Sequence, residues 1–283
     1  MSRAPGRAAR PARVFAAQVV LLARGRRWVP LAAALALSGL VAAVLPVLPG
    51  VRFRWEGGPA APGMAVLLAY PPAVLAAILW ASVVWRGERP RSRDAHWVLP
   101  VDQATHEMLR VVAGAAWLLP GVAALVAFLS LAGGAAGRHL LFPWVALLYL
   151  TSSLTCYLLT SALALRTARP VASLALGLAA WAAAIAALQR AGLGRVAALL
   201  AGVFDGRAGL WTALGAPFDV ATTGGSPRLA GDPRRWAMAM LLWLAVSSLL
   251  VAAAAWARRE RHHATPPLPR SPESVPPRRL SSP

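Results

Sequence analysis

Six long apolar stretches dominate the pattern of hydrophobic and polar positions along the chain. They cover residues 29–48, 64–85, 111–131, 141–165, 171–188 and 236–256. None of the six contains Asp, Glu, Arg or His. A bilayer-spanning helix needs about 20 mostly apolar residues. The pattern therefore predicts an all-α, polytopic membrane protein with six transmembrane helices.

The distribution of basic residues predicts how these helices are oriented. All 29 basic residues are Arg, and the formal net charge is +19. If both termini lie on one side, that side carries 20 of the 29 Arg residues. The positive-inside rule then places both termini in the cytoplasm, in a bacterial plasma (inner) membrane. Because these Arg residues flank the spans, their charge favours contact with the lipid bilayer over nucleic acid.

The two ends of the chain differ from its middle. Residues 1–28 form a basic N-terminal arm whose apolar segment, 14–23, is followed by Arg-rich sequence rather than by a small-residue cleavage site. This favours a helix lying at the cytoplasmic membrane surface over a cleaved signal peptide, with Phe15, Val19 and Leu22 entering the interface. Residues 29–257 form the six-span domain. The tail 258–283, rich in Pro, Ser and Arg, is predicted to be disordered.

The residue inventory excludes several kinds of chemistry. The chain has no Lys, and a P-loop requires one, so ATP hydrolysis would have to come from another polypeptide. Cys156 is the only cysteine, and all five His residues lie outside the apolar stretches without an H-E-x-x-H motif. We therefore expect no metal site, no cofactor bound by this chain and no enzymatic activity.

The loop between the second and third spans, residues 86–110, is the segment richest in candidate chemistry. A charged run is followed by the apolar sequence WVLPV at 97–101 and then by Asp102, a good helix N-cap. Residues 103–110 are predicted to form a short helix leading into the third span, with Asp102, His106 and Arg110 on one face. An apolar patch rimmed by charge is typical of a protein contact site. A solvated connector remains the alternative.

These residues carry a resemblance to a known family. The layout resembles the membrane subunits of type-2 ATP-binding-cassette transporters, the exporter-type permeases. In that family a charged stretch followed by W-x-L-P-V and, further on, Arg leads through a cytoplasmic coupling helix into span three. This sequence has Trp97, Leu99, Pro100, Val101 and Arg110 in that order. The resemblance covers residues 10–258 in topology, and only 86–112 at the level of residues.

The resemblance implies an N-terminal interfacial helix, a coupling helix between spans two and three, and re-entrant segments before span six. It also implies two partners: a separate ABC ATPase subunit, which holds ATP and Mg, and a second permease copy or paralogue. The residues coupling this chain to the ATPase would then be Trp97, Leu99, Pro100, Val101, Asp102, His106, Glu107 and Arg110. The substrate and the direction of transport are not indicated.

Two further regions bear on transport. In loop 189–235, residues 196–203 and 209–214 are apolar but too short to span, and Asp205 and Arg207 between them disfavour a seventh span. Re-entrant segments are favoured, and a loop with two surface helices remains open. In the fourth span, Thr151, Thr155 and Thr160 are candidates for lining a substrate path, although packing between helices is the favoured role of such residues.

We therefore expect a permease subunit that moves an unknown substrate with ATP hydrolysed by a separate subunit. Two alternatives stay open. An ion-coupled secondary transporter usually carries ionisable residues inside its spans, and the six stretches have none. A non-transporting membrane scaffold or assembly subunit would share the topology without needing an ATPase.

Overall fold

The computed structural model of the chain describes residues 9–24, 28–44, 63–85, 102–132, 142–205, 208–214 and 233–264. The predicted coupling residues Trp97, Leu99, Pro100 and Val101 and residues 265–283 of the predicted tail lie outside this part. Residues 258–264, which the sequence predicts to be part of the disordered tail, instead form the end of a helix. The described residues form the helices α1 (Ala9–Arg24), α2 (Val29–Val44), α3 (Gly63–Trp85), α5 (Gln103–Ala132), α6 (Phe142–Ala164), α7 (Pro170–Arg190), α8 (Gly194–Asp205), α9 (Leu210–Leu214) and α10 (Pro233–Ala264). They contain no strand, which confirms the all-α prediction.

Four of these helices, α5, α6, α7 and α10, are long and apolar enough to cross a membrane. Within the described ranges, α2 and the apolar part of α3 from Tyr70 to Trp85 fall below that length. The structure thus supports a membrane-embedded helical protein. The short helix predicted at 103–110 is continuous with the third apolar stretch, because Gln103–Ala132 is one helix of 30 residues, about 45 Å long.

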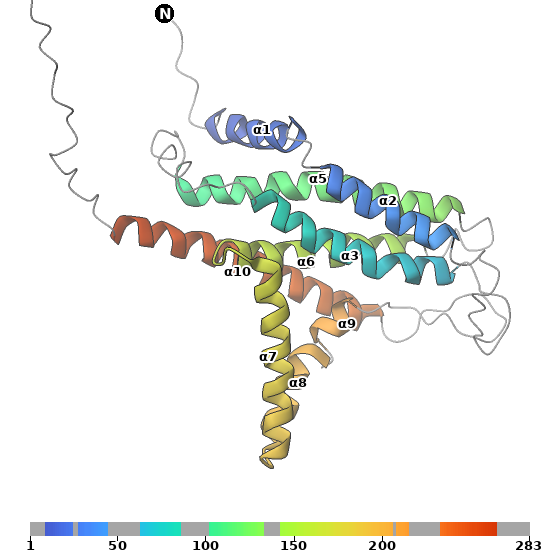
Figure 1. The fold of residues 1–283 in the computed structure, drawn as a ribbon, viewed down its shortest axis with the longest axis vertical. Helices are drawn as coiled ribbons and strands as arrows, with labels where there is room; N and C mark the ends of the chain where they lie inside the picture. The colour runs from blue at the N-terminus through green and yellow to red at the C-terminus, as the bar shows by residue number, and fades with distance from the viewer. Residues whose placement is uncertain are drawn as a thin grey trace, which may run out of the picture.

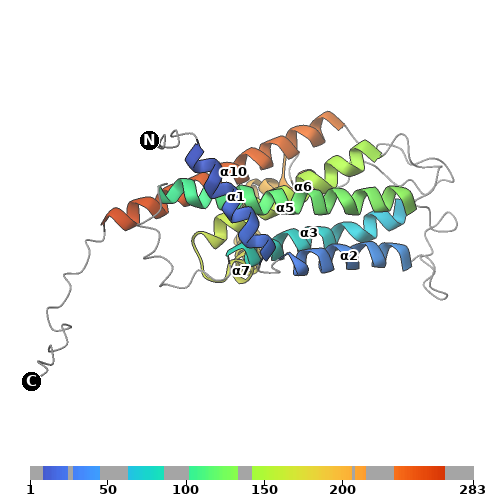
Figure 2. The ribbon, with the colours of Figure 1, turned by 90° about the horizontal axis from the view of Figure 1, so that it is seen from above.

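Five helices, α2, α3, α5, α6 and α10, run side by side as a bundle (Figures 1 and 2). Helix α6 lies inside it, in contact with α3, α5 and α10. Small buried residues of α3, including Ala73, Ala77 and Ala81, let its neighbours approach closely. This is the usual way in which helices pack where lipid removes the hydrophobic driving force between them.

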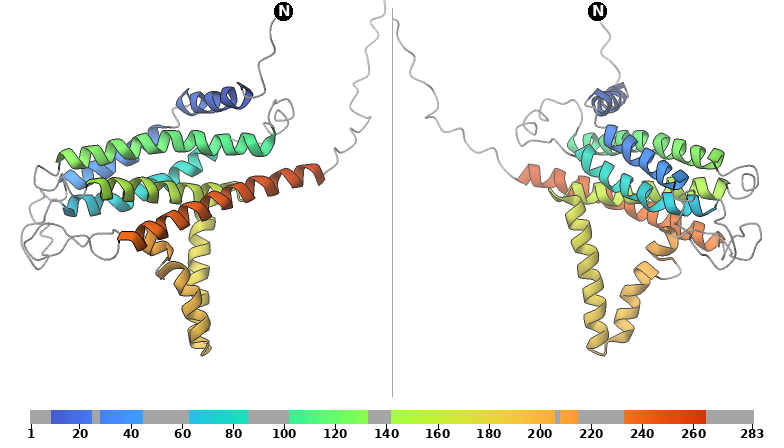
Figure 3. Two further views of the ribbon diagram at one scale, coloured as in Figure 1. Left: turned by 180° about the vertical axis from the view of Figure 1, so that it is seen from behind. Right: turned by 45° about the vertical axis from the view of Figure 1, so that its right-hand side comes forward.

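Helix α1 lies outside the bundle and crosses over α5 (Figures 2 and 3). Phe15 and Val19 pack against the core, and Leu22 is 2% exposed. Trp117 of α5 donates its indole N–H to the main-chain oxygen of Val19 at 3.2 Å. The face expected to enter the bilayer interface is therefore packed against α5. The sequence pattern identified the residues that share the face, but a helical period does not say what covers it.

Helix α7, the predicted fifth span, projects away from the bundle, and α8 returns alongside it (Figures 1 and 3). No residue of α7 is buried. Its contact with α8 includes Trp181 and Phe204, whose ring centroids lie 5.3 Å apart. The two short apolar pieces predicted in loop 189–235 are found as α8 and α9.

Helix α9 is held against the bundle by aromatic donors. Tyr70 of α3 donates its hydroxyl to the main-chain oxygen of Leu214 at 2.7 Å. Trp243 of α10 donates its indole N–H to the main-chain oxygen of Ala208 at 3.0 Å. Buried Tyr and Trp commonly pair their polar atom in this way while the ring fills apolar space.

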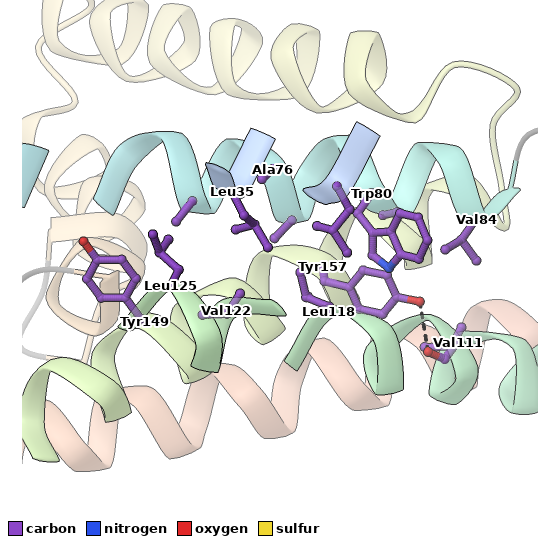
Figure 4. Close-up of a cluster of buried hydrophobic side chains, with 14 of the residues drawn as sticks. Leu35, Ala76, Trp80, Val84, Val111, Leu118, Val122, Leu125, Tyr149 and Tyr157 are labelled. Atoms are coloured by element: carbon purple, nitrogen blue, oxygen red, sulfur yellow. Dashed lines mark hydrogen bonds between the residues drawn. The ribbon is translucent and has the colours of Figure 1, made fainter. Parts of the chain in front are cut away.

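Hydrogen bonds of the same kind, from an aromatic side chain to a main-chain oxygen, join α3, α5 and α6 near the start of α5 (Figure 4). Trp80 Nε1 donates to the main-chain oxygen of Gly114 at 2.8 Å, and the Tyr157 hydroxyl donates to that of Val111 at 2.9 Å. The Tyr157 ring reaches Val111 only because position 114 has no side chain. A Cβ built there would lie 2.0 Å from the Tyr157 hydroxyl oxygen.

Candidate functional site

Polar side chains gather at the first two turns of α5, where four helices meet. We call this site the α5 junction. It is composed of Gln18 of α1, Trp85 and the Val84 carbonyl of α3, Gln103, His106, Glu107 and Arg110 of α5, and Arg258 of α10. It includes the described end of the predicted coupling segment. Polar groups buried at a helix junction must find partners, and His106, Glu107 and Arg110 find theirs in neighbouring helices.

Asp102 starts the helix that carries the junction. Its carboxylate oxygen Oδ1 accepts the main-chain N–H of Thr105 at 2.7 Å, as the sequence predicted for an N-cap. Asp102 is exposed, unlike the junction residues that follow it. It therefore fixes where α5 begins while remaining accessible to a partner.

Replacing Asp102 by Ala should lower the free energy of unfolding by about 1 kcal/mol, because a main-chain N–H in the first turn loses its acceptor. The measurement is unfolding of the purified chain in detergent, followed by circular dichroism. The control is Asp102→Asn, which keeps a side-chain oxygen and should stay close to wild type. An equal loss in both variants would show that the charge, and not the cap, is responsible.

His106 connects α5 to α1. Its Nε2 lies 2.7 Å from the side-chain nitrogen of Gln18, 88 positions earlier in the chain. The Gln18 amide donates when the His106 ring carries its proton on Nδ1. His106 is buried and Gln18 is half-buried, so this contact lies at the boundary between α1 and the bundle.

Glu107 connects α5 to α10. Its Oε1 forms an ion pair with Nη1 of Arg258 at 3.0 Å, and the two side chains are 4% and 16% exposed. Gln103, one turn earlier, donates to the same oxygen at 3.3 Å. A buried carboxylate is strongly destabilising without a cation and hydrogen bonds, and here it has both.

Arg110 connects α5 to the end of α3. Its Nε and Nη2 donate to the main-chain oxygen of Val84 at 3.1 and 2.5 Å. Its guanidinium also stacks over the Trp85 ring, 4.9 Å from the centroid. The last carbonyls of a helix have no partner within the helix, and a cation at that end is favourable. Arg110 thus caps α3 from α5.

The structure brings four of the predicted coupling residues together, and it buries three of them. His106, Glu107 and Arg110 face other helices of this chain, and Asp102 alone is exposed. These three residues contact α1, α10 and α3, respectively. They are therefore placed to connect residue 102 and the segment before it to the rest of the bundle, and their side chains face this chain's own helices.

The candidate path residues of α6 lie inside the bundle. Thr155 and Thr160 are buried, and the Thr160 hydroxyl donates to the Cys156 carbonyl one turn back at 2.8 Å. Thr151 is half-buried and donates to the Leu147 carbonyl in the same way. The hydroxyls of Thr151 and Thr160 thus bond to carbonyls of α6 itself, and the buried Thr155 and Thr160 could line a path only if the bundle opened.

Sequence reasoning missed Gln18 and Arg258, which were assigned to the membrane-surface helix and to the start of the tail. They can be recognised only from the residues that they contact, which lie far away in the sequence, because no local pattern links position 18 to 106 or 107 to 258. Among the described residues, no group of three or more His, Cys, Asp or Glu side chains could hold a metal ion. No family model matches the chain, and neither a curated protein nor a solved structure matches it.

Proposed function

We propose that this chain is the permease subunit of a type-2 ATP-binding-cassette transporter, working with a separate ATPase subunit and with a second permease copy or paralogue. The six spans would be built on α2, α3, α5, α6, α7 and α10, with both termini in the cytoplasm of a bacterium. The observation that carries the proposal is the α5 junction. The segment in which the family couples to its ATPase leads directly into three buried polar residues that contact three other helices.

The mechanism would be mechanical. ATP binding closes two ATPase subunits on each other, the coupling segment 97–102 moves with them, and α5 transmits this movement to the helices it contacts. No residue of this chain performs covalent chemistry, and ATP and Mg are held by the partner. The apolar surface of α7 and its length of about 31 Å match one crossing of the hydrocarbon layer. A crossing parallel to the bundle requires α7 to turn about residues 165–169.

In this proposal α8 and α9 are re-entrant segments on the outer side. Each is apolar and too short to span. The hydrogen bonds from Tyr70 and Trp243 hold the second of them against the bundle, which suits a segment that enters the membrane and returns.

The first test is affinity purification in mild detergent from the native host, with mass spectrometry of the partners. Stoichiometric recovery of a soluble P-loop ATPase with the ABC signature is the expected result. Replacing Val101 and Asp102 together by Arg should reduce that recovery about tenfold, equivalent to about 1.4 kcal/mol of binding free energy, because two bulky charged side chains then stand at the predicted contact. Arg166→Gln, at an exposed position outside the junction, is the matched control. Unchanged recovery of the ATPase with the double variant would contradict the assignment of the coupling segment.

One observation favours a second candidate, an ion-coupled secondary transporter. His106 and Glu107 are buried in the same continuous helix as the third span, where protonatable residues serve as ion relays. Recovery of the chain without an ATPase, together with transport that follows an imposed proton gradient, would favour this candidate. Recovery in a complex of other membrane proteins without transport would favour a scaffold.

A further inference from the structure

Two contacts of the α5 junction join α5 to helices from opposite ends of the chain. Gln18 precedes His106 by 88 positions, and Arg258 follows Glu107 by 151. We call these two contacts, Gln18–His106 and Glu107–Arg258, the α5 clasp. Because His106 and Glu107 are consecutive, their side chains point about 100° apart around α5 and reach different neighbours. One turn of α5 thereby holds α1 and α10 together.

The clasp differs in kind from the other polar contacts between these helices. Arg110, Trp117 and Trp80 each donate to a main-chain carbonyl. Such a bond holds two helices together whatever side chain the accepting residue carries. The clasp joins side chain to side chain, and its Glu107–Arg258 half is an ion pair between a buried carboxylate and a half-buried guanidinium. Sliding α10 along α5 would separate those charges inside the protein, which is strongly unfavourable. The pair therefore sets one register between the two helices.

We propose that Glu107 and His106 are positioning residues that make α1, the start of α5 and the end of α10 move as one body when the ATPase displaces the coupling segment. This inference rests on the proposed function. It assigns to Arg258 and Gln18, which lie outside the family-like segment 86–112, a role in carrying the movement to the two ends of the chain. Helix α3 moves with this body because Arg110 of α5 is bonded to its end.

The test measures distances between spin labels in the full chain. Cys156 is replaced by Ser, so that labels attach only to introduced cysteines at exposed positions. One pair, Val112→Cys with Ala253→Cys, reports the distance between α5 and α10. A second pair, Val112→Cys with Ala17→Cys, reports the distance between α5 and α1. Distances are recorded in the purified chain and in its complex with the ATPase, without nucleotide and with ATP and vanadate.

In the otherwise unchanged chain we expect one narrow distance for each pair, the same in both nucleotide states. Glu107→Arg or Arg258→Glu should abolish the single α5–α10 distance and leave the α5–α1 distance intact. The double exchange, Glu107→Arg with Arg258→Glu, restores opposite charges and should restore the narrow distance. Glu107→Gln serves as the milder variant if reversal prevents folding. In the single variants, ATP and vanadate should shift the α5–α10 distance. If the ion pair only stabilised the fold, nucleotide would not shift that distance in the variants.

Two results would overturn the inference. Either the single variants keep the narrow α5–α10 distance, or ATP and vanadate change that distance in the chain with an intact clasp. Failure of the proposed function has a different signature. No ATPase then binds, and nucleotide has no effect on any pair, while the charge dependence in the isolated chain still shows that the clasp holds α5 and α10 in register.

Discussion

Gly114→Ala is expected to lower the free energy of unfolding by about 3 kcal/mol, at the upper end of the effect of adding a methyl group to a packed core. The new Cβ would lie 2.0 Å from the hydroxyl oxygen of Tyr157 and 3.0 Å from a methyl carbon of Val84. Tyr157 must then move, which breaks its hydrogen bond to Val111. The measurement is denaturant-induced unfolding of the purified chain in detergent.

The chain offers a matched control. Gly177 also lies inside an apolar helix, α7, but a Cβ at that position meets nothing within 4 Å. Gly177→Ala should therefore be neutral or stabilising by up to about 1 kcal/mol. Adding Tyr157→Phe to Gly114→Ala removes the clashing oxygen and should recover part of the loss. Equal behaviour of the two glycine variants would contradict the close approach of α5 and α6.

Arg110→Met is expected to lower the free energy of unfolding by about 2–4 kcal/mol. It removes two charge-assisted hydrogen bonds to the Val84 carbonyl and the stacking on Trp85. The carbonyl at the end of α3 is then left without this donor. Unfolding in detergent measures the loss, and near-ultraviolet circular dichroism reports the changed environment of the Trp85 ring.

Two variants sharpen this prediction. Arg166→Met, at an exposed position, should change stability by no more than about 0.5 kcal/mol. Arg110→Lys keeps the charge but lacks the planar fork and its stacking, so it should recover less than half of the loss. Full recovery with Lys would mean that the positive charge alone stabilises the end of α3.

The helices were predictable because each leaves a strong local signal. The apolar stretches at 141–165, 171–188 and 236–256 fall within or close to α6, α7 and α10, and residues 103–110 join α5 as expected. Asp102 was identified as an N-cap from its position alone, and the structure shows the predicted bond. Such features depend on neighbours within a few residues, which the sequence displays directly.

What covers a helix face was not predictable in the same way. The face of α1 that carries Phe15 and Leu22 was expected at the lipid interface and is packed on α5. Trp236, at the start of the sixth apolar stretch, is buried, whereas Trp256 at its end and Trp28 before the first stretch are exposed. Lipid and a neighbouring helix are equally apolar, so hydrophobicity alone cannot distinguish them.

The candidate site was half predictable. Arg110 was identified from the family-like pattern, and His106 and Glu107 from the helix predicted after Asp102, but neither signal carries information about burial. Gln18 and Arg258 emerge only when α1 and α10 are folded onto α5. Contacts that join positions 88 or 151 residues apart depend on the topology of the whole bundle.

The exposed surface of α7 has a consequence for which substitutions the sequence of this protein can accumulate in evolution. A helix with no buried residue is constrained in its overall composition, since it must stay apolar and helical, but no single side chain of it has to fit a particular neighbour of its own bundle. In α5 the reverse holds at Gly114 and Arg110, where one particular residue satisfies the surrounding geometry. Substitutions among Ala, Leu and Val should therefore accumulate freely along α7. The first turns of α5 should instead accept changes only in pairs.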